Sequence, residues 1–378
     1  MLNVIMCLDP VEGGGSVERV YQLSRELALA GETCTILTTM QGWSDEHARA
    51  LGNVKVVALP YLTKRYKIPL GLGRWLREHV RDYDLVHLSM NWTVISAITY
   101  LYLRIYRRPY AFSAMGFAVS LGTRSRLLKR VFRVLFTRPM ATNACACIAV
   151  SAREVQDYEQ LGVAQHRIAL IPNAIPAESF VEYDDGRAFR ARHGLERCPY
   201  ILFIGRLHPI KGPDLLIQAF ATIVKDFPDH RLIIAGNNYG FLSDLERLAR
   251  SHDVLERVIF RDPIFGDEKK SAYRGAELFV IPSRFDTMTI VALEAAALGA
   301  PILLSNHCDF GALQDAGGAI AVDANVEALA AGLVNALNRP DLREMGSRGR
   351  QFVLRSYRWD SVRDQFISVF KQCLLERQ

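Results

Sequence analysis

The sequence predicts an α/β protein made of two doubly wound parallel-sheet domains, and three observations support this prediction. The 378 residues exceed the roughly 250–300 residues at which a single core stops growing. Half of the residues are hydrophobic and 23% are charged, which is typical of folded proteins and excludes a disordered chain. Short β-rich runs alternate with helix-like segments in both halves, and right-handed βαβ winding turns this alternation into parallel sheets. We expect the two domains to face each other across a cleft.

The first domain is predicted over residues 1–173. It begins with a strand at 2–8 and continues with an amphipathic helix at 17–30, which Gly31 ends. The other strands predicted in this half are 34–38, 54–59, 85–89, 110–113, 146–150 and 167–171. The breaker-rich segment 172–176 predicts a hinge between the domains.

The second domain is predicted over residues 174–357, and a last helix over 358–378. Its short apolar runs are typical of strands buried in parallel sheets: 200–204, 232–235, 258–260, 278–281 and 301–304. A good helix-forming segment at 290–298 ends at Gly299, shortly before Pro301. The most apolar stretch, 92–103, is shorter than the about 20 residues that span a bilayer. We therefore expect a soluble protein, and the N-terminus lacks the basic segment of a cleaved signal.

The cysteines and one acidic pair argue against metal sites. The seven cysteines include no C-x-x-C pair, so we expect neither a disulfide scaffold nor a zinc module, but reduced thiols in a cytoplasmic protein. Cys145 and Cys147 are predicted to be separate buried thiols. Asp82 and Asp84 have D-x-D spacing at a helix–strand junction, where a solvated turn is the favoured interpretation.

A glycine triplet, Gly13-Gly14-Gly15, separates the first predicted strand from the first helix. Glycines let backbone amides approach a phosphate, and the start of the next helix favours negative charge. A flexible turn is the alternative, and for a glycine triplet it is the commoner case. Neither G-x-G-x-x-G nor G-x-x-x-x-G-K-[ST] occurs here, which disfavours a dinucleotide oxidoreductase and a P-loop enzyme.

A stronger signal follows the strand at 200–204, which runs into the basic segment 205–212, Gly-Arg-Leu-His-Pro-Ile-Lys-Gly. Arg206 and Lys211 are thereby predicted at the carboxyl edge of a parallel sheet, where such folds bind ligands. Two cations between glycines suit a diphosphate. The alternative is a solvated basic loop.

Two acidic residues eight positions apart form the third signal. Asp286 is predicted in a loop and Glu294 in the helix that follows it. A loop carboxylate can bind sugar hydroxyls and a helix carboxylate ribose hydroxyls, while the helix N-terminus favours a phosphate. Glu294 lies in an otherwise apolar helix, so it needs a partner if it is buried; otherwise it is an exposed glutamate.

These motifs together resemble the retaining glycosyltransferases of family 4, which have the GT-B fold of two Rossmann-like domains. The resemblance extends from the glycine triplet to the last helix, and its strongest parts are 205–212, the acidic pair that ends in Glu294-Ala295, and Ile171-Pro172-Asn173. It implies an enzyme of bacterial polysaccharide or glycan assembly. It also implies that the last helix crosses back onto the first domain.

The resemblance assigns roles to individual residues. Gly14 and Gly15 are expected to approach the donor phosphates, and Arg206 and Lys211 to neutralise the diphosphate leaving group. The other donor contacts implied are Asp286 to the transferred sugar, Glu294 to the ribose, Thr289 and Ile290 at a helix start, and Ile264 beside the nucleotide base. The acceptor side is expected to include His87, Met115 and Gly116, although a core or cleft-wall histidine is the alternative for His87.

Two departures from the family pattern concern the sugar and the acceptor. The family usually has Glu followed by Gly-Phe-Gly where this chain has Asp286-Thr287-Met288-Thr289, which changes the space around the transferred sugar. A histidine commonly precedes the glycine that corresponds to Gly116, and here Met115 stands in its place.

The positive charge is concentrated in the first half. Residues 1–173 contain 21 Lys and Arg against 13 Asp and Glu, a net charge of +8, whereas the whole chain has +6. Between residues 85 and 152 there is no acidic residue, and a segment with helical spacing carries Arg126, Lys129, Arg130 and Arg133 among apolar residues. This pattern suits an anionic membrane surface, and equally a helix packed on the domain core. Nucleic acid is disfavoured because no fold signature for its binding accompanies the charge.

The sequence therefore predicts a retaining hexosyltransferase. We expect a UDP- or GDP-hexose donor, a glycan or lipid-linked acceptor, and no metal or other cofactor. We expect it in the cytoplasm, with a peripheral position on the inner face of the membrane as one option. The alternatives are a catalytically degenerate GT-B scaffold subunit and a nucleotide-sugar epimerase.

Overall fold

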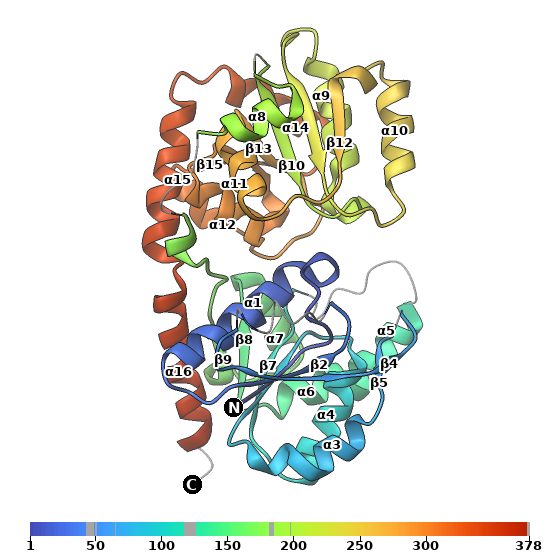
Figure 1. Ribbon diagram of the computed structural model, residues 1–378, viewed down its shortest axis with the longest axis vertical. Helices are drawn as coiled ribbons and strands as arrows, with labels where there is room; N and C mark the ends of the chain where they lie inside the picture. Colours follow the sequence, from blue (N-terminus) through green and yellow to red (C-terminus); the bar gives the residue numbers. More distant parts are fainter. Residues whose placement is uncertain are drawn as a thin grey trace. The chain divides into compact units, whose positions relative to one another are not determined.

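The computed structural model describes residues 1–42, 49, 51–64, 66–116, 126–180, 185–196 and 198–375, and the side chains of all of these except 10–12, 126 and 127. The chain forms two compact units. One comprises Met1–Asn173 and the C-terminal segment that begins at Trp359, and the other comprises Ala174–Arg358. Each unit is built on a parallel sheet with helices around it (Figure 1), so the predicted fold class is confirmed.

The described part of the first unit contains a sheet in the order β3-β2-β1-β6-β7-β8-β9, with every neighbouring pair parallel. Its strands are β1 (Leu2–Val4), β2 (Thr35–Thr39), β3 (Lys55–Leu59), β6 (Val86–Ser89), β7 (Tyr110–Ser113), β8 (Ala146–Ala149) and β9 (Ile168–Leu170). All residues of the strands β6, β7 and β8 are buried, the polar His87, Ser89 and Ser113 among them, so both faces of these strands are covered. The strand order reverses between β1 and β6.

Helices surround this sheet. They are α1 (Pro10–Leu29), α3 (Leu72–His79), α4 (Val94–Ile105), α5 (Arg126–Phe132), a π-helical turn (Arg133–Thr137), α6 (Arg138–Thr142), α7 (Ala152–Gln160) and α16 (Trp359–Leu375). A small antiparallel hairpin, β4 (Tyr61–Leu62) with β5 (Ile68–Pro69), was not predicted because strands of two residues carry no periodicity.

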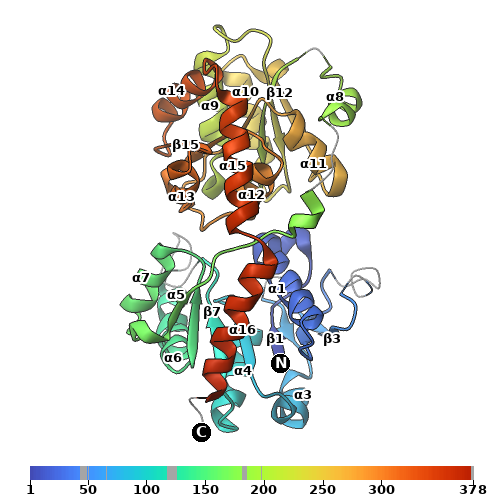
Figure 2. The same ribbon diagram turned by 90° about the vertical axis from the view of Figure 1, so that its left-hand side faces the viewer.

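The last helix, α16, lies along α1 in the first unit (Figure 2). Arg19 of α1 is fully buried beneath it, with its guanidinium 5.1 Å from the ring centre of Phe366. The guanidinium donates to the backbone oxygens of Ile171 and Pro172 and to the side-chain oxygen of Asn173, at 2.7 to 2.8 Å. Burial lowers the pKa of Arg19 to about 10. The buried Arg19 thereby fixes the backbone of residues 171–173, where the N-terminal segment of the first unit ends.

The structure corrects the expected role of His87. Its ring is buried in β6, where one nitrogen lies 3.1 Å from Asn3 Oδ1 and the other 2.8 Å from Ser113 Oγ. Phe366 and Phe370 of α16 pack on the ring. Because α16 covers it, His87 is a core histidine with satisfied hydrogen bonds, and its assignment to the acceptor side was wrong.

The expectation of reduced thiols was wrong for one pair. Cys145, just before β8, forms a disulfide with Cys373 of α16, and their Cα atoms are 5.3 Å apart. The partners are 228 residues apart in sequence, so spacing along the chain could not indicate the pair. Cys147 is a buried free thiol, and burial raises its pKa well above the usual range.

Two further sequence features of the first unit are placed as follows. The glycine triplet lies inside α1 instead of before it, and Gly14 interrupts the helix with φ 53° and ψ −140°. That conformation is readily adopted by glycine and strained for other residues, so the helix bends at this point. Asp82 and Asp84 are exposed in the turn before β6, in agreement with a solvated turn.

The described part of the second unit contains a parallel sheet in the order β12-β11-β10-β13-β14-β15. Its strands are β10 (Tyr200–Ile204), β11 (Arg231–Ala235), β12 (Val258–Arg261), β13 (Leu278–Ile281), β14 (Ile302–Ser305) and β15 (Ala319–Val322). Its helices are α8 (Arg187–His193), α9 (Pro213–Ile223), α10 (Leu242–Ser251), α11 (Gly266–Gly275), α12 (Ile290–Ala297), α13 (Gly311–Asp315), α14 (Val326–Leu337) and α15 (Leu342–Ser356).

Both faces of this second sheet are covered. Side chains of β10 alternate between two cores: Leu202 and Ile204 join the core under α11 and α12, and Ile201 and Phe203 join the core under α9 and α14. Burial on both faces explains why the strand sequences are continuously apolar. The edge strand β15 was not predicted, although its residues Ala-Ile-Ala-Val are all apolar; three of the four are partly exposed.

We predict that His87 makes the first unit less stable at acid pH. Burial lowers the pKa of its imidazole to about 3, below the value near 6.5 that it regains on unfolding. The unfolded chain therefore binds the extra proton below pH 6.5, and the His87 contribution to the free energy of unfolding falls by about 1.4 kcal/mol per pH unit down to the folded pKa. Urea unfolding of wild type and His87→Gln between pH 6.5 and 4 measures this contribution as the difference between their slopes. Equal slopes, or an NMR titration of His87 near pH 6.5, would contradict the prediction.

Candidate functional site

The second unit places two predicted site residues at one point of its sheet. The strand order reverses between β10 and β13, which lie side by side. The loop 205–212 follows β10, and the loop 282–289 follows β13, so both leave the carboxyl edge at the reversal. Open parallel sheets bind ligands at such a point.

Glycine at position 212 allows these two loops to touch. Gly212 has φ 71°, and a Cβ atom at this position would lie 2.0 Å from the backbone oxygen of Pro282. Larger residues are therefore excluded by both conformation and space. Across the same contact, the Arg284 amide donates to the Ile210 oxygen at 2.8 Å.

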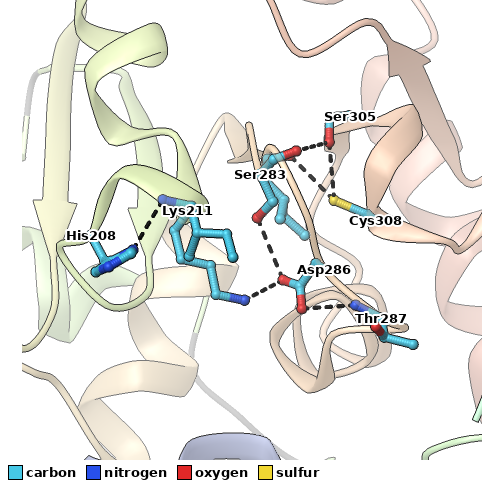
Figure 3. Close-up of polar contacts among 9 residues, drawn as sticks. His208, Lys211, Ser283, Asp286, Thr287, Ser305 and Cys308 are labelled. Atoms are coloured by element: carbon cyan, nitrogen blue, oxygen red, sulfur yellow. Dashed lines mark hydrogen bonds and ion pairs between the residues drawn. The ribbon is translucent and has the colours of Figure 1, made fainter. Parts of the chain in front are cut away.

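Lys211 and Asp286 extend from these loops toward one another (Figure 3). The Lys211 Nζ atom lies 2.5 Å from Asp286 Oδ2, and the two side chains are 17% and 14% exposed. Asp286 Oδ2 also accepts from the Ser283 hydroxyl at 3.4 Å, and Oδ1 accepts from the Thr287 amide at 3.0 Å. The carboxylate is thus oriented at both oxygens beside a cation.

A third loop, which follows β14, supports this arrangement (Figure 3). The Asp286 amide donates to the His307 oxygen at 2.9 Å, and the Ser305 hydroxyl donates to the Ser283 oxygen at 2.5 Å. Cys308 is buried below them, and burial, with a smaller effect of Asp286, raises the pKa of its thiol to about 12. The thiol is therefore protonated at neutral pH and contributes packing.

Arg206 lies at the start of the same basic loop with an exposed side chain. Its guanidinium carbon is 5.8 Å from the centre of the Tyr239 ring, which follows the neighbouring strand β11. His208 stands between the two cations and accepts from the Ile210 amide at 3.1 Å. Partial burial, and then Arg206 and Lys211, lower the pKa of His208, so its ring is neutral at pH 7. The exposed guanidinium of Arg206 is therefore the positive charge of this loop that an anion can reach from solvent.

Glu294 lies in α12 and has two partners on α11. Its Oε2 atom is 2.6 Å from Lys269 Nζ and accepts from the Tyr273 hydroxyl at 3.2 Å. Burial, and then Glu294, raise the pKa of Tyr273 well above the usual range. The structure thus supplies the partner that an acidic residue in an apolar helix needs.

Within the described part of the chain, the structure shows no polar side-chain contact for three other predicted donor-binding residues, Thr289, Ile290 and Ile264. Thr289 precedes α12 as its N-cap, and its side chain makes no capping hydrogen bond. Ile290 and Ile264 are buried, and Ile264 belongs to the apolar core. The side chains of these two isoleucines are therefore buried, and only their backbone atoms are available to a ligand.

The first unit places its candidates at the carboxyl edge of its own sheet. Gly14 and Gly15 follow β1, while Met115 and Gly116 follow β7 with φ 57° and 93°. The Gly116 amide donates to the buried Glu154 carboxylate at 2.7 Å, which fixes the backbone there. Residues 117–125, which follow this turn, lie outside the described residues.

Sequence reasoning missed several residues of these sites. Lys269 and the Arg284–Asp214 pair stand in no recognised motif. Met90 and Trp92, after β6, have φ of 72° and 61°, a left-handed conformation that is uncommon for such side chains and that sequence patterns do not reveal. The one signal for Lys269 in the sequence is its spacing: it precedes Tyr273 by four residues, which places both side chains on the same face of a helix.

In comparisons with known proteins, both units match domains of glycosyl transferases. Residues 185–352 match the family model described as glycosyl transferases group 1, and residues 14–174 match that of a glycosyl transferase 4-like domain. Among solved structures, Anabaena Alr3699/HepE in complex with UDP and glucose is similar with a TM-score of 0.81, at 16% identity and 98% coverage of both chains. At this identity the likeness concerns the fold.

Curated relatives extend the comparison. A D-inositol 3-phosphate glycosyltransferase of Acidothermus cellulolyticus is 32% identical over 60% of this chain and 52% of its own length. One of Corynebacterium urealyticum is 27% identical over 95% of this chain and 91% of its own. A GDP-mannose-dependent alpha-(1-6)-phosphatidylinositol monomannoside mannosyltransferase of Mycolicibacterium smegmatis is 30% identical over 50% of this chain and 52% of its own. The chain thus spans about half the length of two of these relatives and nearly all of the third.

We predict that Arg284 and Asp214 couple the two loops energetically. Arg284 donates to both carboxylate oxygens of Asp214, at 2.8 and 2.6 Å, and also to the Pro209 oxygen. This bidentate pair is partly exposed, so we expect a coupling free energy of about 1 kcal/mol between Arg284→Met and Asp214→Asn in a double-mutant cycle of chemical unfolding. Strict additivity of the two substitutions would show that the pair does not join the loops. The exposed pair Arg247–Asp244 on α10 is a matched control with a smaller expected coupling.

Proposed function

The chain belongs to the family 4 glycosyltransferases, and we propose that it transfers a hexose from a nucleotide diphosphate sugar to a glycan or lipid-linked acceptor with retention of configuration. The observation that carries this proposal is the Lys211–Asp286 pair at the reversal of strand order. Arg206 adjoins it on the same loop, and Glu294 follows it on the next helix. A diphosphate, a sugar and a ribose each have a suitable partner in this set.

We propose a UDP- or GDP-hexose as the donor. One relative is named for GDP-mannose, and one structural neighbour was solved with UDP and glucose. Glu294 is proposed to bind the ribose hydroxyls, and the start of α12 at Thr289 a phosphate. Gly14 and Gly15 of the first unit are proposed as further contacts to the donor phosphates.

The proposed chemistry needs positive charge at the leaving group. The bond between the anomeric carbon and the donor's phosphate oxygen breaks, and negative charge develops on the diphosphate. Arg206 and Lys211 stabilise that charge, while Asp286 orients the sugar through its hydroxyls. The acceptor hydroxyl attacks from the face that the phosphate leaves, and its proton passes to the departing phosphate oxygen. Because two side chains supply the positive charge, we propose that the reaction needs no metal.

We propose in addition that the first unit binds an anionic membrane surface through the helical segment 128–135, here called the α5 surface. Leu128, Val131, Val134 and Leu135 are 45 to 59% exposed on it. Phe132 packs toward the unit against Trp92 and Phe136, at 5.2 and 5.0 Å between ring centres. The aromatic residues therefore anchor the helix, and four aliphatic side chains are left facing solvent.

Charge favours an anionic lipid as the occupant of the α5 surface. Lys129, Arg130 and Arg133 accompany the exposed aliphatic side chains, and the net charge of +8 over residues 1–173 has the same sign. The side chain of Arg126 lies outside the described residues. Within the described chain no helix has the length and apolar character needed to cross a bilayer, so binding would occur at the interface. Relatives named for inositol phosphate and phosphatidylinositol mannoside acceptors are consistent with an anionic acceptor.

We predict that purified protein converts one member of a panel of UDP- and GDP-hexoses when a membrane extract is supplied as acceptor. Lys211→Ala should lower turnover by at least a hundredfold, because it removes a cation from the developing charge. Circular dichroism at the assay temperature checks that the variant is folded. NMR of the product should show the anomeric configuration of the donor, and EDTA should leave the rate unchanged. Mass spectrometry detects the product.

Three results would overturn the proposed reaction. Unchanged turnover in Lys211→Ala would remove Lys211 from the mechanism. Conversion of the donor without an acceptor would indicate an epimerase. A folded protein that binds no nucleotide sugar in a thermal-shift panel would be a scaffold subunit.

We predict that the protein floats with vesicles of phosphatidylglycerol and not with vesicles of phosphatidylcholine. The double variant Leu128→Asp/Leu135→Asp should reduce flotation by at least tenfold, because it places two charges in the apolar contact. Leu29→Asp, at an exposed leucine of α1, is the matched control and should float as wild type does. Equal flotation of all three proteins would exclude the α5 surface.

A further inference from the structure

Helix α11 carries a lysine that touches the proposed ribose-binding residue. Lys269 Nζ lies 2.6 Å from Glu294 Oε2, and the two side chains are 21% and 19% exposed. Residues four apart lie on one face of a helix, so Tyr273 stands one turn below Lys269. Its hydroxyl donates to the same Oε2 atom at 3.2 Å. Two donors from one helix face thus converge on one oxygen of Glu294.

This convergence fixes the orientation of the carboxylate. Glu294 is largely removed from water, and Ala292, Leu293 and Ala295 around it in α12 are buried. Removing the lysine would leave this carboxylate without its cation in an apolar surrounding, which is costly. Because both contacts are to Oε2, neither involves Oε1, the oxygen that remains for a ligand.

We propose that Lys269 is a positioning residue for nucleotide recognition: it orients Glu294 so that the carboxylate accepts hydrogen bonds from the two vicinal hydroxyls of a ribose. This inference rests on the proposed function, in which the second unit binds a nucleotide sugar. A preorganised carboxylate loses less conformational freedom when it binds than a mobile one does. Lys269 therefore increases affinity for a ribonucleotide without touching it.

A structural role for the Lys269–Glu294 pair makes a different prediction. If the pair only joins α11 to α12, its loss affects every ligand of the second unit equally. If Lys269 positions Glu294, its loss affects ligands with ribose hydroxyls and spares ligands that lack them. A comparison of ribose with 2′,3′-dideoxyribose nucleotides separates the two roles.

The experiment is calorimetric titration of the full chain with UDP and GDP, and with the 2′,3′-dideoxy form of whichever binds. We expect wild type to prefer the ribonucleotide. Lys269→Met should weaken ribonucleotide binding on the order of tenfold, as expected for the loss of a hydrogen bond to a charged group, and change dideoxynucleotide binding less than twofold. Lys269→Arg should restore most of the preference, because a guanidinium can also donate to Oε2.

Two further variants complete the design. Lys270→Met is the matched control, because the neighbouring Lys270 has a similarly exposed side chain and pairs with Asp267, 3.4 Å away; this variant should bind both nucleotides as wild type does. Tyr273→Phe removes the second donor and should cause a smaller loss, again confined to the ribonucleotide. It provides the measurement if Lys269→Met does not fold, as shown by its thermal midpoint.

The outcomes distinguish this inference from the proposed function. Equal weakening of both nucleotides by Lys269→Met, or an unchanged preference for ribose, would overturn the positioning role while the proposed function stands. If wild type binds neither UDP nor GDP, the proposed donor site is wrong and the positioning role falls with it.

Discussion

The site in the second unit depends on one topological constraint, the reversal of strand order between β10 and β13. Parallel strands all end at one edge of a sheet, and chains that leave two neighbouring strands toward opposite faces open a crevice between them. Here the chain leaves β10 through the loop that ends at Gly212 and leaves β13 through the loop that contains Asp286. Because α9 begins at Pro213 and α12 at Ile290, each of the two loops ends at the start of a helix.

The Lys211–Asp286 ion pair contributes little to the stability of the fold. Bringing two charges out of water costs about as much as their attraction returns, so an ion pair of this kind stabilises a fold little more than apolar side chains would. Ser283 and Thr287 nevertheless hold the carboxylate, and the loop after β14 holds the backbone that carries it. So many contacts on one carboxylate are better explained by the need to hold it for a ligand than by stability. In the proposed reaction, an arriving diphosphate takes over the lysine and leaves Asp286 to a sugar hydroxyl.

The sequence predicted the local elements well and the contacts between distant segments poorly. The strands β7, β10 and β13 have their predicted bounds, because strands buried on both faces are continuous apolar runs between breakers. Arg206, Lys211 and Asp286 were predicted from their own motifs, but the contact across the reversal needs the strand order. His87 was misplaced because α16, which covers it, comes from the far end of the chain. The Cys145–Cys373 disulfide depends on the same packing.

The departure from the family's acid-Gly-Phe-Gly pattern is smaller in the structure than in the sequence. Met288 occupies the position of the phenylalanine and is likewise an apolar side chain, buried here in the core, with its amide donating to the Cys308 oxygen at 3.0 Å. It adopts φ 44° and stands between Thr287 and Thr289, which replace the two glycines of the family pattern. Thr289 still forms the N-cap of α12. The loop therefore keeps its anchors, and the remaining change is that Asp286 is one methylene shorter than glutamate. If Asp286 contacts the transferred sugar as proposed, a shorter carboxylate that still faces Lys211 alters the space for that sugar without dismantling the site, so we favour a changed donor sugar over a degenerate scaffold.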